Sequence, residues 1–113
     1  MKRTLLLAAA VGLSALANAQ APAKPDPAKA KEIVNQICAA CHGPTGAGIP
    51  RNYPRLSGQW SDYTLAQLKA FKSGERGLDK GGKDVNGQIM VGVARGMSEA
   101  QMKALADYAQ GLR

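Results

Sequence analysis

Two cysteines and a histidine lie within five consecutive residues, Cys38-Ala39-Ala40-Cys41-His42. The 113-residue chain has no other cysteine and no other histidine. A separation of three residues places the two thiols about one turn apart on the same face of a helix. Any fold of this chain therefore has to accommodate two thiols and an imidazole at one point of the backbone.

Several kinds of site contain cysteine and histidine, and the spacing distinguishes them. A zinc site needs four protein ligands, or three and a water, and one short stretch offers too few in too little space. A thioredoxin-like pair belongs in a strand–helix–strand context that this chain lacks. A disulfide across two intervening residues would be strained and would leave His42 without a role.

The spacing C-x-x-C-H is the attachment pattern of c-type haem. Two thiols one helical turn apart can form thioethers with two adjacent vinyl groups of one porphyrin, and the next residue then carries its imidazole to the iron. We therefore predict one covalently attached haem c, held by Cys38 and Cys41, with His42 as an axial iron ligand.

The first residues resemble a secretory signal peptide. Lys2 and Arg3 precede an apolar stretch over residues 5–17, and Ala17-Asn18-Ala19 is an A-x-A cleavage signal. A bilayer-spanning helix needs about 20 apolar residues, more than this stretch offers. We expect cleavage after Ala19, export to the periplasm and no permanent membrane anchor, with an uncleaved membrane tether as the alternative.

The remaining chain suits one small domain. We expect residues 1–19 to be the signal peptide, 20–26 a mobile lead and 27–113 a single domain. One Phe, one Trp and three Tyr are few for a core, so a bound cofactor is the expected source of extra stability.

The charge balance bears on partners. The net charge is +7, and it falls to +5 without Lys2 and Arg3. We expect acidic docking surfaces on partner redox proteins. Export and the scattered distribution of the basic residues argue against nucleic acid.

Helical signals occur along the whole domain. Asp26 and Pro27 form a typical helix start, and the apolar spacing predicts a helix to about residue 40, ending near Gly43. A loop rich in Gly and Pro follows over residues 43–59. Ser61 is the expected cap of a second helix, which ends at Gly74.

The later part of the domain contains a polar segment and a final helix. We expect residues 75–88 to be mobile and the apolar run 89–93 to form one or two helical turns. Ser98 and Gln101 form a capping-box pattern before the last helix. No segment predicts a convincing strand, so the fold class is all-α.

Three methionines remain after signal cleavage as candidates for the second axial ligand. Met97 and Met102 flank Ser98 at the two positions of a hydrophobic staple, which gives both a structural role. Met90 has no such role and is far enough from His42 in sequence to reach the opposite haem face. We predict Met90 as the second axial ligand, and the alternative is that it only fills the core.

From Cys38 to Arg113 the sequence resembles the small mono-haem bacterial class I cytochromes c and single halves of the related di-haem cytochromes c. The matching segments are CAACHGPTGAG, YPRLSGQ, DYTLAQLKAFKSGER and MVGVARGMSEAQMKALADYAQGL. The resemblance implies the cytochrome c fold, in which three to five short helices wrap around one covalently bound haem. A single attachment motif excludes a complete di-haem chain.

The resemblance also implies roles for individual residues. It implies that Met90 is the axial methionine and that Leu56 packs on the haem face. It also implies that the His42 ring N–H donates a hydrogen bond to the Pro54 carbonyl. Further candidates are Arg55, Gln59 and Trp60 for the haem propionates, and Ile37 and Tyr108 for the crossing of the first and last helices.

These features predict a one-electron carrier that cycles haem iron between Fe(III) and Fe(II). With both axial positions filled, no site remains for a small-molecule substrate, so we do not expect an enzyme. The alternatives are a dedicated electron-acceptor subunit of a periplasmic dehydrogenase or reductase, and a small haem enzyme or gas sensor with an open axial site. The basic residues expected near the exposed haem edge are Arg51, Lys72, Lys80 and Lys83.

Overall fold

The structure is a computed structural model that describes residues 24–78 and 81–112. The predicted signal peptide, the first part of the predicted lead and Lys80 lie outside these ranges. Within them the chain is helical, and the only strand-like pairing is an isolated bridge between Ile49 and Tyr53. The predicted all-α class is confirmed.

The first helical segment carries the cysteine–histidine motif. It consists of α1 (Pro27–Ile33), a π-helical stretch η1 (Val34–Cys38) and α2 (Ala39–His42). As predicted, the side chain of Asp26 caps it, accepting hydrogen bonds from the N–H groups of the second and third helical residues at 3.0 and 3.2 Å. The helix ends at Gly43, whose φ of +82° favours glycine.

The second helix, α3 (Ser61–Ser73), begins differently from the prediction. Ser61 is not its cap but its first helical residue, and the hydroxyl donates instead to the carboxylate of Asp107. The Ser61 N–H donates to the Gln110 side chain at 2.8 Å. Because both partners belong to the last helix, a long-range contact replaces the local cap. The predicted end of the helix, at Gly74, is confirmed.

The third helix, α4 (Val85–Arg95), is longer than predicted. The prediction of a mobile segment was wrong for residues 85–88, which form the first turn of α4. The Asp84 side chain caps this turn by accepting from the Gly87 N–H at 2.8 Å. Gly87 is buried against Gly77, where an added Cβ would lie 2.8 Å from the Gly77 Cα. A glycine that lowers helix propensity therefore allows two backbones to pack closely.

The last helix, α5 (Glu99–Gly111), begins with the predicted capping box. The Gln101 N–H donates to the Ser98 hydroxyl at 3.1 Å, and the Ser98 N–H donates to the Gln101 side chain at 2.9 Å. Its buried residues include Met102, Leu105 and Ala109, which share one face of the helix.

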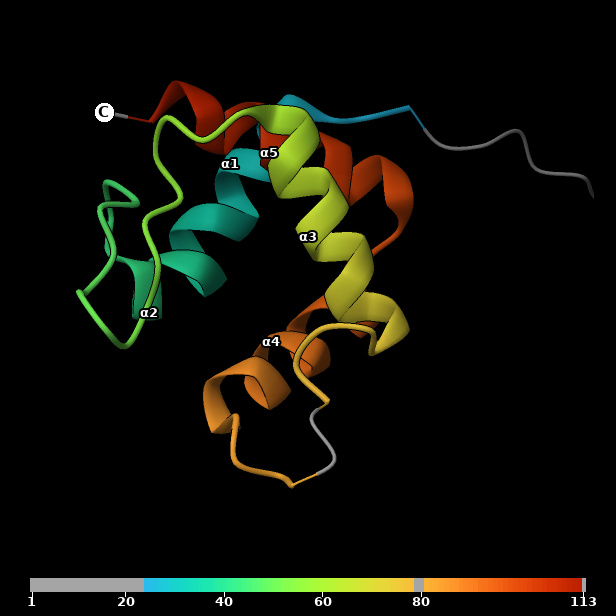
Figure 1. The fold of residues 1–113 in the computed structure, drawn as a ribbon. Coiled ribbons are helices and arrows are strands. Elements are labelled where there is room, and N and C mark those ends of the chain that lie inside the picture. The colour runs from blue at the N-terminus through green and yellow to red at the C-terminus, as the bar shows by residue number, and fades with distance from the viewer. Residues whose placement is uncertain (1–23, 79–80, 113) are drawn as a thin grey trace, which may run out of the picture.

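The core is built from two clusters. The first joins α1 and α5 and consists of Ala30, Val34, Met97, Met102, Ala104 and Leu105. The second joins α3 and α4 and consists of Phe71, Val91 and Ala94. Figure 1 shows α1 and α5 near the start of α3 and α4 at its far end, with α2 and the following loop to one side. The elements that carry the motif and Met90 thus lie on different sides of the fold.

Candidate haem site

A cavity of about 390 Å³ opens between the motif, the loop over residues 43–60, α3 and α4. Its lining combines apolar side chains from both core clusters with polar side chains from the loop. The predicted site residues that line it are Cys38, Cys41, His42, Pro54, Leu56 and Met90. The fold therefore brings together residues that are up to 52 positions apart in sequence.

The two cysteines are free and partly buried. Burial raises the pKa of the Cys38 thiol, an effect to which the nearby Cys41 adds and which a backbone hydrogen bond opposes. No group of three or more His, Cys, Asp or Glu side chains that could hold a metal ion occurs in residues 24–78 and 81–112.

His42 is buried, with 6% of its surface exposed. Its Nδ1 lies 2.7 Å from the carbonyl oxygen of Pro54. A carbonyl oxygen only accepts hydrogen bonds, so Nδ1 carries a proton, and in the neutral ring Nε2 keeps its lone pair. The Tyr53 ring meets the imidazole edge to face at a centroid distance of 6.1 Å. The ring is thus held in the tautomer and orientation that an iron ligand requires.

Met90 lines the cavity from α4 and packs against the Phe71 cluster. Met97 also lines the cavity, but it is 7% exposed and belongs to the first core cluster. Its backbone carbonyl accepts a hydrogen bond from Lys72 Nζ. Met102, at 2% exposed, does not line the cavity. Met97 is therefore the structural competitor against which Met90 has to be tested.

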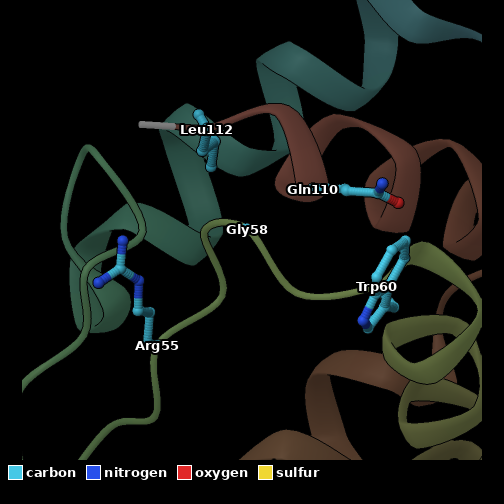
Figure 2. Close-up of a pocket in the computed structure, with 5 residues that line it drawn as sticks. All are labelled: Arg55, Gly58, Trp60, Gln110 and Leu112. Carbon is cyan, nitrogen blue, oxygen red and sulfur yellow. The ribbon is translucent and has the colours of Figure 1, made fainter.

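The three residues predicted near the haem propionates lie in two places. Arg55 and Gln59 line the cavity, and Arg55 Nε donates to the hydroxyl and carbonyl oxygens of Ser57. Trp60 is 76% exposed and lines a second hollow of about 450 Å³, to which Arg55 also contributes. Figure 2 shows the indole beside Gln110, apart from Arg55. Trp60 is therefore not among the residues that line the cavity beside Cys38, Cys41 and His42.

Three of the basic residues predicted near the exposed haem edge belong to the described part of the chain. Arg51 lines the cavity from a loop position with φ of +71°. Lys72 Nζ donates a hydrogen bond to the backbone oxygen of Met97, between α4 and α5. Lys83 is exposed at the approach to α4.

The chemistry of the lining fits a haem. Exposed large apolar side chains that gather at one place mark a surface that a ligand or partner covers. Three of them line the cavity, namely Ile37 at 49%, Tyr63 at 53% and Ile89 at 52% exposed. A flat apolar group attached to the two thiols would cover them while an imidazole faces its metal.

Several lining residues carry no motif that sequence reasoning could use. Gln67 and Phe71 follow Tyr63 at spacings of four residues, which places all three on one face of α3. Arg76 stacks on Phe71 at 4.6 Å from the ring centroid. The helical spacing is the signal for the α3 residues, whereas nothing local to Arg76 indicates its position. Ile37 lines the cavity, while its predicted companion Tyr108 packs against the first core cluster.

The chain matches the cytochrome c family over residues 27–113. This protein belongs to the cytochrome c family. The match covers every element that lines the cavity and agrees with the haem attachment pattern of Cys38, Cys41 and His42. The cofactor of this family is covalently attached haem c.

Two curated relatives and one solved structure give the degree of similarity. Cytochrome c-554(548) of Halomonas halodenitrificans is 38% identical over 71 residues, which are 63% of this chain and 78% of that protein. A thiosulfate dehydrogenase electron acceptor of Stutzerimonas stutzeri is 39% identical over 71 residues, 63% of this chain and 30% of that protein. The cytochrome c4 structure of Acidithiobacillus ferrooxidans superimposes with a TM-score of 0.64 at 33% identity, covering 80% of this chain and 52% of that one. The chain thus spans about half of a cytochrome c4.

Proposed function

We propose that this protein is a one-electron carrier of a periplasmic or respiratory redox chain, with His42 and Met90 as the two axial ligands of its haem. The observation that carries the proposal is that His42, in the tautomer that leaves Nε2 available, lines the same cavity as Met90. An imidazole and a thioether together favour a raised reduction potential and leave no open iron position.

Haem iron, when bound, supplies reversible one-electron chemistry. The chain's own residues have three tasks. Cys38 and Cys41 fix the group to the helix, and Pro54 holds the His42 ring through its Nδ1 proton. Apolar walls, including Leu56, limit the access of water and so help to set the potential. We propose no catalytic residue and no small-molecule substrate.

The partners we propose are redox proteins with acidic docking surfaces. The basic net charge of the chain supports this, because opposite charges raise association rates at low salt. The second candidate is an electron-acceptor subunit devoted to one dehydrogenase or reductase. The similarity to a protein named as the electron acceptor of thiosulfate dehydrogenase favours this candidate.

We also propose that residues 1–19 are a signal peptide cleaved after Ala19, that residues 20–26 form a short lead to the domain and that the domain over residues 27–113 functions in the periplasm. The basic start, apolar run and A-x-A signal of the sequence support the proposal. Among the described helices, none is long and apolar enough to cross a membrane. Mass spectrometry of the exported protein would give the cleavage point and the added mass of haem together.

The axial ligands are tested by replacing the two methionines of the cavity one at a time. We expect Met90→Ala to remove the weak far-red absorption band of sulfur–iron ligation and to lower the reduction potential. Met97→Ala, the matched control, should keep the band. Loss of the band in Met97→Ala but not in Met90→Ala would refute the assignment. A wild-type protein that is high-spin and binds carbon monoxide readily would instead favour a haem enzyme or gas sensor.

The two carrier hypotheses are separated by purification. A free carrier should elute alone from mildly extracted native cells and exchange electrons with several redox proteins. An acceptor subunit should co-elute with one large dehydrogenase or reductase. Co-elution would reject the freely diffusing carrier.

A further inference from the structure

Gly48 lies between His42 and the carbonyl that orients its ring. The Gly48 N–H donates to the backbone oxygen of His42 at 2.8 Å. On its other side, an added Cβ would lie 2.6 Å from the Tyr53 oxygen, 2.7 Å from the Pro54 carbonyl carbon and 2.8 Å from the Arg55 nitrogen. Real Cβ atoms essentially never show contacts below 3.0 Å. The Pro54 peptide therefore occupies space that any other residue at position 48 would fill.

The neighbouring hydrogen bonds fix this peptide from both ends. The Ile49 N–H donates to the Tyr53 oxygen at 2.8 Å, and the Tyr53 N–H donates back to the Ile49 oxygen at 2.9 Å. Beyond Pro54, the Leu56 N–H donates to the Gly46 oxygen at 2.8 Å. Residues 46–49 thus form a frame that connects the backbone of His42 to the acceptor of its side chain.

We infer that Gly48 is a positioning residue for the axial imidazole: its lack of a side chain lets the Pro54 carbonyl accept the His42 Nδ1 proton. The inference rests on the proposed ligation of iron by His42. Gly48 is not among the residues that line the cavity, and it acts through the distance between the Pro54 oxygen and Nδ1.

The size of the effect follows from the distances. A Cβ at position 48 needs the Pro54 carbonyl carbon to move by about 0.7 Å, from 2.7 Å to the 3.4 Å at which ordinary contact begins. Directed along the hydrogen bond, such a shift would lengthen the 2.7 Å distance to about 3.4 Å, beyond the usual limit of about 3.2 Å. The imidazole that donates a weaker hydrogen bond is a less basic ligand, which stabilises Fe(III) less. The reduction potential of a variant with a side chain at position 48 should therefore be higher than that of the wild type.

Gly48→Ala tests the inference, and Gly58→Ala is its matched control. The two glycines have nearly the same φ, +76° and +74°, but an added Cβ at Gly58 has no atom within 4 Å. Both substitutions therefore carry the same backbone strain, and only one displaces the Pro54 peptide. We expect the His42 Nδ1 proton of reduced, ¹⁵N-labelled Gly48→Ala to exchange with solvent about tenfold faster than in the wild type. Its potential should rise, whereas Gly58→Ala should change neither quantity.

Equal exchange rates and equal potentials in the two variants would overturn the inference. If Gly48→Ala does not fold, the wild-type protein provides a second test by hydrogen exchange in increasing denaturant. The Gly48 N–H and the His42 Nδ1 proton should then open together, with one dependence on denaturant. Exchange of the Nδ1 proton while the Gly48 N–H stays protected would overturn the inference.

Failure of the proposed function gives a different result. If His42 does not bind iron, its ring signals in the reduced protein lack the large shifts that a nearby porphyrin causes. That outcome rejects His42 as a ligand, whatever the two glycine variants do. With the shifts present, the glycine comparison tests only the positioning role of Gly48.

Discussion

Met97 and Met102 should be structural residues whose loss destabilises the fold without changing the iron ligands. They are 7% and 2% exposed and belong to one core cluster with Val34. Truncation of a buried methionine to alanine lowers the free energy of unfolding by about 2–5 kcal/mol. Met102 is almost fully enclosed, so we expect Met102→Ala to lower the free energy of unfolding by about 3 kcal/mol. Met97 precedes the helix and is slightly more exposed, which suggests about 2 kcal/mol.

The two losses should not be additive. The side chains stand at the two staple positions around the Ser98 cap and fill the same cluster. Once one of them is removed, the other has fewer contacts to lose, so the double variant should be destabilised by about 1 kcal/mol less than the sum. Denaturant unfolding followed by far-ultraviolet circular dichroism measures all three variants on the haem-loaded protein. Losses below about 1 kcal/mol for both single variants would refute the structural role of the pair.

Two further predictions concern electrostatics and backbone packing. The hydrogen bond from Lys103 lowers the pKa of Asp107 below 3.8, so the carboxylate stabilises the fold above that pH and the contribution is lost as pH falls. Asp107→Asn should cost less than about 1 kcal/mol at pH 7 and progressively less as the pH falls through the lowered pKa, and a cost that does not change with pH would contradict the argument. Gly77→Ala should cost roughly 2–5 kcal/mol by denaturant unfolding, because φ is +88° and the new Cβ would lie 2.5 Å from the Gly87 oxygen. Gly58→Ala has a similar backbone strain but no overlap with another atom. An equal loss of unfolding free energy in both variants would show that the close approach of residue 77 to Gly87 contributes nothing.

Local signals in the sequence predict the helix ends where a side chain bonds its own backbone. Asp26 and Ser98 cap the helices that their residue types indicate. Ser61 has the same chemistry, but its hydroxyl has a carboxylate within reach on α5. A serine hydroxyl can bond either the nearby helix N–H groups or a side chain distant in sequence, and the distant partner is known only from the fold. The motif Cys38-Ala39-Ala40-Cys41-His42 could be recognised from the sequence for a related reason, because all of its residues lie within about one turn of one helix.

The start of α4 could not be predicted because its causes are distant in sequence. Gly87 reduces helix propensity in any local assessment. In the fold it meets Gly77, and a larger residue at either position would separate α4 from the segment after α3. The lining positions of Tyr53 and Arg76 depend equally on contacts with other segments. Such residues become visible only when the elements around the cavity are in place.

The cavity also explains why so small a core can hold this fold together. Val34 and Leu105 of the first cluster and Phe71 of the second all line it, so a haem there would contact both clusters at once. The half-exposed Ile37 and Ile89 would then become part of a single interior instead of costing free energy at the surface. The group that supplies the redox chemistry thus also completes the hydrophobic core. For this reason a substitution that loosens the cavity wall should lower stability and shift the reduction potential together, whereas one in the outer network of Asp107 should change stability alone.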